Sequence, residues 1–277
     1  MKTLFFVFAL ICVSFTFAQS AEQPVRYTAH NKGKFFVYWG GNRDQYSKSD
    51  ITFKGKDYNF TIYDVPAEDR PKGWHIDYIN PARMTVPQTN ARIGYYISDH
   101  YSIALSLDHM KYVMLQDVPV RLSGTYSNAG SFGEQLPNNN VLLTEKFLTF
   151  EHTDGLNFVH AEVSRIDDFS FLFKIKNTDK LQINLTEGLG AGLLYPKTNT
   201  ELLGKERHDD YNIAGYGLCA KVGLNVTFWK HFFVQTELKG GYINMQNIRT
   251  TASADDSASQ SFFFSQQIIA FGGIFRL

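Results

Sequence analysis

The feature that most constrains this chain is a series of long segments in which apolar residues alternate with small or polar ones. In one of them, Leu218 and Leu224 occupy alternate positions, while Lys221 and Asn225 stand at the positions between. Such alternation places the two sets on opposite faces of a β-strand. These segments run well beyond the about five to six residues of an ordinary strand. Long strands with one apolar face suit a wall that crosses a bilayer.

We expect eight such strands in the chain. In order, they span Lys34–Asp44, Gln88–Ile97, Tyr101–Met114, Gly155–Arg165, Lys180–Tyr195, Asp210–Phe228, His231–Asn247 and Ser261–Leu277. The connections between them alternate between short and long, and the longest cover residues 45–87 and 115–154. This is typical of a barrel with tight turns at one end and long loops at the other.

The sequence therefore predicts an all-β fold, a closed antiparallel up-and-down transmembrane β-barrel with long extracellular loops. Eight strands are favoured, but ten stay open, because Asp50–Lys54 and Tyr58–Tyr63 in the first long loop form a hairpin pattern of their own. The second long loop is rich in Gly and Asn, and we expect it to be mobile and exposed. An even number of strands places both termini on the tight-turn side, in the periplasm.

The first eighteen residues have the layout of an export signal. Lys2 is followed by the apolar run Leu4–Phe17, and Ala18 supplies a small residue for cleavage. We expect 1–18 to be a signal peptide, 19–33 a periplasmic N-terminal segment and 34–277 the outer-membrane barrel. Of the two cysteines, only Cys219 would remain after cleavage, so no internal disulfide can form.

Composition excludes several classes of protein. The 27 Lys and Arg balance 27 Asp and Glu, which argues against a nucleic-acid partner drawn by a basic field. Aromatic residues make up 15% of the chain, which argues against disorder. With two cysteines, a cysteine-rich metal site is excluded. We expect neither a metal nor a cofactor.

Charged residues on the less apolar strand faces predict the nature of the interior. They are Arg92, Asp108, Glu162, Lys221, Glu237, Lys239 and Arg276. A narrow barrel is filled by its own side chains, and a buried charge must be paired. We therefore predict an ion-pair network that plugs the barrel, in preference to a polar path for ions. Glu187 does not fit, because alternation places it on the lipid face, and a β-bulge beside it would turn it away.

Two groups of apolar residues mark the membrane boundary and the chain end. Aromatic residues near strand ends predict a membrane-interface belt: Trp39, Phe228, Trp229, Phe232 and Phe233. Alternation also continues to the last residue, and the pattern of Phe271, Phe275 and Leu277 resembles the C-terminal assembly signal of bacterial outer-membrane barrels.

Evidence for catalysis is weak. The sequence contains no GxSxG, HExxH, CxxC or P-loop motif. His160, Glu162 and Ser164 share one strand face, but residues two apart on a strand lie about 6–7 Å apart. We regard them as weak catalytic candidates and as interior hydrogen-bonding residues in the favoured interpretation. Whether the protein is an enzyme stays open, but the lack of a recognised catalytic motif favours a protein that is not an enzyme.

The segments RIDDF, GAGLLYP, GYGLCAKVGL and QTELKGGYIN, with the closing FGGIFRL, resemble an uncharacterised outer-membrane family of Bacteroidota. The layout resembles small bacterial outer-membrane β-barrels, the class that includes the transmembrane domain of OmpA. Bacterial outer-membrane β-barrels prefer an aromatic residue at the C-terminal position, where this chain has Leu277. The resemblance implies location in a Gram-negative outer membrane.

The resemblance also implies partners: outer-membrane lipids, lipopolysaccharide and the barrel-assembly machinery, which reads the C-terminal strand. Neither resemblance nor residues name an extracellular ligand. We expect a structural, adhesion or surface-interaction role through the long loops. The alternatives are an enzyme that modifies acyl chains of lipid A or phospholipid, and a narrow pore.

Overall fold

The computed structural model describes residues 30–73, 87–127, 132–208 and 210–277. The expected signal peptide and most of the expected segment 19–33 lie outside these residues. In the part of the chain that is described, no helix has the length and apolar character needed to span a membrane.

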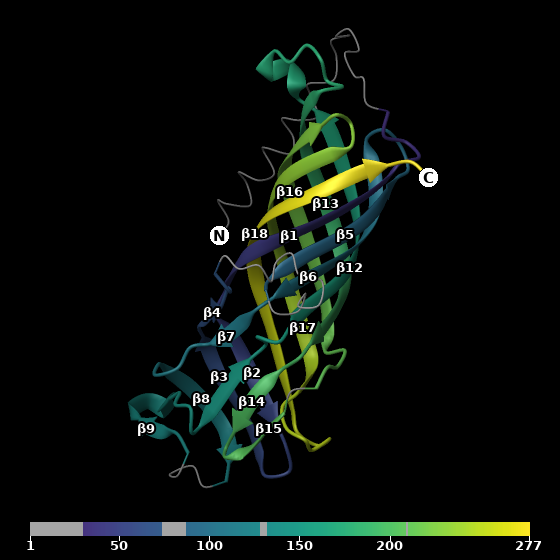
Figure 1. The fold of residues 1–277 in the computed structure, drawn as a ribbon. Coiled ribbons are helices and arrows are strands. Elements are labelled where there is room, and N and C mark those ends of the chain that lie inside the picture. The colour runs from purple at the N-terminus through teal and green to yellow at the C-terminus, as the bar shows by residue number, and fades with distance from the viewer. Residues whose placement is uncertain (1–29, 74–86, 128–131, 209) are drawn as a thin grey trace.

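Eight long strands form the main sheet, and every neighbouring pair is antiparallel (Figure 1). They are β1 (Phe35–Tyr46), β5 (Thr89–Tyr96), β6 (Tyr101–Met110), β12 (Leu156–Asp168), β13 (Leu181–Pro196), β16 (Gly215–Phe228), β17 (Phe232–Arg249) and β18 (Ser257–Phe275). They pair in that order, and β18 also pairs with β1. The prediction of an all-β antiparallel fold is confirmed, and the long strands lie where alternation placed them.

The two faces of the main sheet differ in the way that the alternation predicts. In β16, Leu218 and Val222 are 51% and 46% exposed, whereas Lys221 between them is 8% exposed. In β17, Leu238 is exposed and Lys239 beside it is completely buried. The sheet thus turns its apolar side chains outward and its charged ones inward, the reverse of a water-soluble protein.

The expected strand Tyr101–Met114 is in fact two strands. β6 ends at Met110, and β7 (Tyr112–Met114) pairs in a second sheet. The break has a physical basis, because all residues of β7 are buried and the inward–outward alternation ends there. The expected strand at 210–228 likewise begins only at Gly215.

The long links fold into a compact unit, which we call the head (Figure 1). Its strands are β2 (Ser49–Lys54), β3 (Tyr58–Val65), β4 (Ala67–Asp69), β7, β8 (Pro119–Tyr126), β9 (Glu134–Leu136), β10 (Asn140–Leu142), β11 (Leu148–Glu151), β14 (Asn199–Leu202) and β15 (Lys205–His208). One group extends the main sheet in the order β18-β2-β3-β8-β10-β9, and a second sheet has the order β15-β14-β11-β7-β4. The described part of the link 115–154 thus contains short strands, and its Gly- and Asn-rich stretch is largely exposed, as expected, while its mobility stays a prediction.

Aromatic packing explains why these links are ordered. The Phe53 ring lies 5.3 Å from that of Phe60 and 5.5 Å from that of Phe150, and the Phe60 ring lies 5.9 Å from that of Phe147. All four side chains are buried. Because different links supply the two sides of this core, no single link could bury its apolar residues alone.

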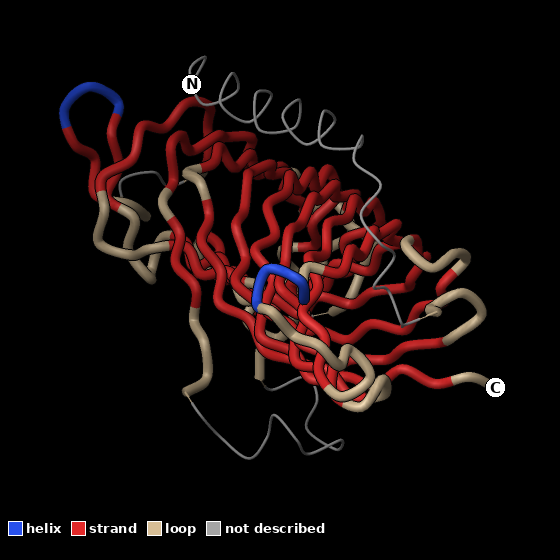
Figure 2. Tube along the Cα trace, turned by 90° about the horizontal axis from the view of Figure 1, so that it is seen from above, coloured by secondary structure: helices blue, strands red, loops and turns tan. Residues whose placement is uncertain are grey.

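The opposite end of the main sheet has short turns. At Trp229 and Lys230 both φ angles are positive, 48° and 66°, the backbone of a tight hairpin turn that matches strand twist. Between β12 and β13 a short 3-10 helix, η5 (Ser170–Phe173), completes the connection. Figure 2 shows how strands dominate the chain in the view from above. Arg276 donates to the backbone oxygen of Lys32 at 3.0 Å, so the two described chain ends meet at this side.

Replacing Phe150 by alanine should loosen the head and spare the main sheet. Phe150 is 1% exposed, and truncating a buried Phe costs about 3–5 kcal/mol. We expect faster proteolysis within the head and no change in the protection of β16 and β17. Equal loss of protection in both regions would show that the head is not a separate unit of stability.

Acid should also destabilise the head through His152. Burial lowers the pKa of His152 from 6.5 to about 3, and its Nδ1 lies 2.9 Å from Thr198 Oγ1. The open state binds a proton below pH 6.5 while the folded state stays neutral, so stability falls as the pH drops from about 6.5 toward 3, by up to about 1.4 kcal/mol per unit. Hydrogen exchange of β11 and β14 at pH 7 and pH 4.5, corrected for intrinsic rates, measures this. His152→Gln should abolish most of the difference, and an unchanged difference would contradict the assignment.

Candidate functional site

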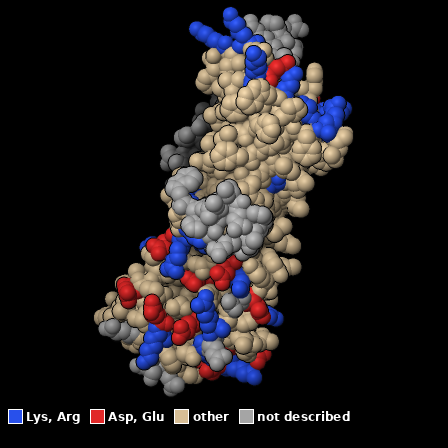
Figure 3. Space-filling view, viewed as in Figure 1, with Lys and Arg blue, Asp and Glu red and all other residues tan. Residues whose placement is uncertain are grey.

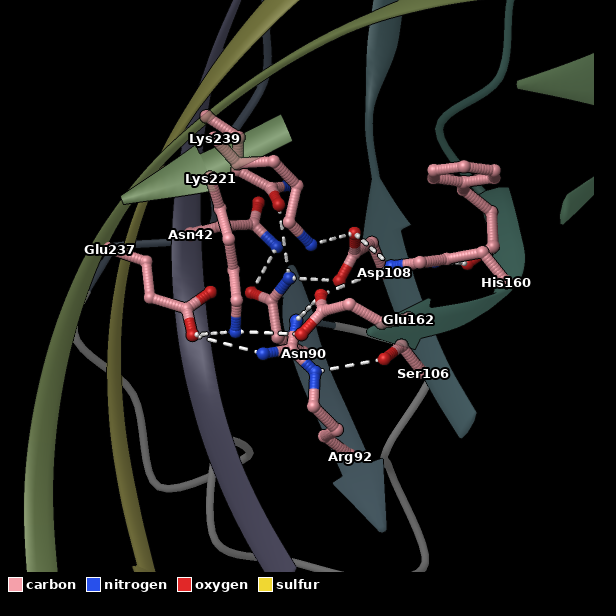
Figure 4. Close-up of polar contacts among 12 residues, drawn as sticks. Asn42, Asn90, Arg92, Ser106, Asp108, His160, Glu162, Lys221, Glu237 and Lys239 are labelled. Atoms are coloured by element: carbon pink, nitrogen blue, oxygen red, sulfur yellow. Dashed lines mark hydrogen bonds and ion pairs between the residues drawn. The ribbon is translucent and has the colours of Figure 1, made fainter. Parts of the chain in front are cut away.

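A cluster of paired charges lies on the buried face of the main sheet (Figure 4). Arg92, from β5, reaches Glu162 of β12 at 2.9 Å and Glu237 of β17 at 3.0 Å. Lys221, from β16, contacts the same two carboxylates at 2.8 Å each. Two cations and two anions thus alternate in a compact ring in which each carboxylate contacts both cations.

A second pair lies next to this ring. Lys239 of β17 donates to Asp108 of β6 at 2.5 Å. The structure therefore brings together six of the seven charged residues that alternation placed inside, and we call these six the interior network. The seventh, Arg276, is exposed, because it follows the last residue of β18 and donates to the backbone oxygen of Lys32. The three cations match the three carboxylates, and the side chains of Arg92 and Glu237, for example, are at most 1% exposed.

Neutral side chains complete the interior network. Asn90 donates to Asp108 at 2.6 Å, Arg92 donates to Ser106 at 2.8 Å, and Gln235 donates to Glu237 at 2.5 Å. Sequence reasoning missed these supporting residues because it considered only charged ones. The signal was available, since each has the same parity along its strand as the charged residues beside it.

Apolar and aromatic side chains fill the interior between the network and the short turns. Phe36, Tyr38, Tyr96 and Phe233 form a buried cluster there with Ile274 and others. A cavity whose lining includes these four aromatic residues has a volume of about 20 Å³, roughly enough for a single water molecule. Together the two layers fill the interior across the middle of the main sheet.

The buried position of Phe233 corrects one sequence prediction. We expected it in a membrane-interface belt, but it is 4% exposed and packs against Tyr38 with ring centroids 6.4 Å apart. The reason is parity, because Phe232 and Phe233 must point to opposite faces of β17. Phe232 and Trp229 are outward and more than 60% exposed, while Trp39 and Phe228 are half-buried.

The chain end also faces outward. Phe271 and Phe275 are 65% and 38% exposed and belong to β18, and Leu277 follows the strand. These positions are compatible with recognition by another protein during assembly, which stays a prediction.

The weak catalytic candidates are close together but unsuited to nucleophilic chemistry. Ser164 donates its proton to Glu162 at 2.5 Å, while Glu162 is already paired with two cations. His160 Nε2 lies 3.8 Å from Glu162 and 3.9 Å from Asp108, and its ring stacks on Phe158. Serine therefore faces a neutralised acid rather than the imidazole base that a nucleophile needs.

The close approach around His160 depends on the glycines of the GxGxG string in β13. A Cβ added at Gly190 would lie 2.8 Å from both His160 Cδ2 and Cys219 Sγ, and one at Gly192 would lie 2.0 Å from the carbonyl oxygen of Val159. These glycines give room for the interior side chains. Among the described residues, no group of His, Cys, Asp and Glu has the geometry to hold a metal ion.

The β-bulge that we expected beside Glu187 is not present in the described strands. Glu187 pairs directly with Arg165 in β12 and with Val222 in β16, and neither ladder shows a register shift. Its side chain is exposed on the apolar outer face, where strict alternation placed it.

No protein-family model matches the sequence, and no curated protein matches it. Among solved structures, the chain is similar to the outer membrane protein OprG from Pseudomonas aeruginosa, with 10% identity over 90% of this chain and 99% of that chain and a TM-score of 0.39. It is also similar to Ail, the attachment invasion locus protein of Yersinia pestis, with 9% identity over 88% and 99% and a TM-score of 0.33. Neisserial surface protein A follows with 11% identity over 85% and 98% and a TM-score of 0.29. At these values the likenesses do not assign the chain to a family.

Removing one partner of a buried pair should be costly. In Lys239→Met, Asp108 would lose the ammonium that lies 2.5 Å away, and an unpaired buried charge costs about 3–5 kcal/mol. We expect a large fall in the urea midpoint of the folded protein in detergent, and recovery of much of it in the double variant with Asp108→Asn.

The matched control is Lys56→Met. Lys56 pairs with Asp255 in the head, but both side chains are more than half exposed, so the midpoint should hardly move. Equal effects of the two substitutions would contradict a special role for the interior pair.

The filled interior should not conduct ions. In a planar bilayer the purified protein should show no discrete openings, because a space of about 20 Å³ cannot pass a hydrated ion. Stable unitary conductance would contradict this prediction.

Proposed function

We propose that this protein is an integral outer-membrane β-barrel that presents the head as a surface-contact module. The observation that carries the proposal is the inverted distribution of side chains: the outer face of the main sheet is apolar and exposed, and its inner face is charged, paired and buried. Water would penalise such an outer face, whereas hydrocarbon favours it.

The strand pairing supports a closed, eight-stranded barrel. The register can be followed from strand to strand through directly opposed residues: Phe35, Tyr95, Ile103, Val163, Leu189, Ala220, Gly240, Ser265 and Gln45. The path starts on β1 at Phe35 and returns to β1 at Gln45, so one circuit shifts the register by ten residues. For eight strands, such a stagger corresponds to a tilt of about 40° from the barrel axis.

Side chains along the wall support its place in a bilayer. Exposed aromatic residues occur near both ends of the strands, with Phe232 and Phe275 toward the short turns and Tyr195 and Phe263 toward the head. On the face seen in Figure 3, charged side chains gather at the two ends, with a band of other residues between them. That arrangement matches an apolar belt with flanking girdles.

In this orientation the head lies outside the cell and the short turns, with both termini, lie in the periplasm. The head offers a stable surface, because its strands share one aromatic core and continue the ladder of β18. We infer a structural, adhesion or surface-interaction role for it, with outer-membrane lipids and lipopolysaccharide around the wall and β18 as the signal for barrel assembly.

Heat-modifiable mobility tests the barrel. Purified from membranes in detergent, the protein should migrate differently on a denaturing gel before and after boiling. Externally added protease should cut the head on intact cells and leave the β16–β17 turn untouched. A protein that dissolves without detergent, or that shows one mobility in both conditions, would overturn the proposal.

A further inference from the structure

A carboxylate on the lipid-facing side of a membrane wall needs an explanation. Glu187 is exposed on the same face as Leu185 and Leu189, and charged residues within a membrane are costly and usually functional. Its cross-strand neighbour Arg165 could have been its partner, but Arg165 instead makes a two-pronged contact with Asp167, at 2.7 and 3.2 Å. Glu187 therefore presents its charge outward.

An apolar hollow lies on the same face, and its lining residue Leu189 is two positions from Glu187 along β13. Its volume is about 970 Å³, and its lining includes Ile93, Leu105, Ala161, Val163, Leu189 and Ala191. The hollow exists because small side chains stand between larger ones, with Ala161 opposite Ala191. It is lined by residues of β1, β5, β6, β12, β13 and β16, and this apolar lining suits acyl chains.

Polar groups line the edge of the hollow that is nearer the short turns. Arg165, Glu187 and Tyr101 each stand two residues beyond a lining residue, namely Val163, Leu189 and Ile103, which is about 6–7 Å along a strand. Arg165 Nη1 lies 3.4 Å from the hydroxyl of Tyr101. A guanidinium has five N–H groups, so donors remain after its contacts with Asp167 and Tyr101.

We propose that this edge and hollow bind an aminophospholipid of the periplasmic leaflet, with a primary ammonium head group of the phosphatidylethanolamine type. The acyl chains fill the hollow, the phosphate accepts from Arg165 and Tyr101, and the ammonium donates to Glu187. Opposite charges on the protein and on the zwitterionic head group are thus matched one to one. The site rests on the proposed barrel, because only a bilayer brings lipid to this face.

The chemistry discriminates between head groups. A primary ammonium donates hydrogen bonds to a carboxylate, whereas a choline head group has no N–H to donate. A phosphatidylglycerol head group lacks the cation and adds a net negative charge beside Glu187. The site should therefore prefer ethanolamine to choline and glycerol.

Native mass spectrometry of the full protein tests the site. The protein is released from nanodiscs that contain equal parts of phosphatidylethanolamine, phosphatidylcholine and phosphatidylglycerol, and the lipid that it retains is identified. We expect one retained phosphatidylethanolamine. Glu187→Gln should reduce its preference over phosphatidylcholine by about tenfold, the effect of one charge-assisted hydrogen bond.

Two further variants separate the head-group contact from the hollow. Ala191→Leu fills the hollow and should reduce retention of every lipid. Its control is Thr236→Leu, an exposed wall position whose cross-strand partners Leu224 and Ile269 do not line the hollow. The control for the charge is Glu201→Gln, an exposed carboxylate in the head. Neither control should change retention.

Several results would overturn the site. The first is equal retention of the three lipids by the wild type, and the second is an unchanged lipid preference in Glu187→Gln. The third is a dimer of the wild type that Glu187→Gln separates into monomers, because the hollow would then be occupied by a second copy of the protein. Heat-modifiable mobility of each variant shows whether it is folded. A protein with heat-modifiable mobility but no lipid preference would contradict only the proposed lipid site. A protein that is soluble without detergent would contradict the proposed barrel.

Discussion

The pairing of β1 with β18 is the constraint on which the rest of the architecture depends. Twelve residues of β1, from Phe35 to Tyr46, find partners in β18. In a hydrocarbon environment an unpaired strand edge would leave its backbone N–H and C=O groups without partners, at a cost of several kcal/mol each. With both edges paired, the outer face can be apolar throughout, and the inner face must be satisfied by its own side chains.

The interior network follows from that geometry. In the proposed barrel, an eight-stranded wall would enclose a space that side chains can fill, and the inner face of the main sheet carries three cations, three carboxylates and supporting amides. Replacing so many charges by apolar residues could leave the fold equally stable, because buried ion pairs seldom exceed their desolvation cost. What the charges would provide is specificity, since a shift of one residue in β17 would turn Lys239 and Glu237 to the apolar outer face.

How much could be predicted depended on the range of the physical signal. Alternation is local, so it located the long strands, and it placed Lys221 inside and the adjacent Val222 outside. It failed for Phe233 only because the aromatic character was weighed above parity. The head could not be predicted, because Phe53 and Phe150 come from separate links and their contact has no local pattern. The short strand β7 was absorbed into a longer one for the same reason.

The extension of β18 beyond the wall has a mechanical consequence. Its first residues pair with β2 of the head over Ser257–Gln260, while the remainder pairs with β1 and β17. A pull applied to the head would therefore load these ladders along the strand direction, where many hydrogen bonds resist together instead of breaking one by one. In the proposed barrel, a head anchored in this way would transmit force directly into the wall.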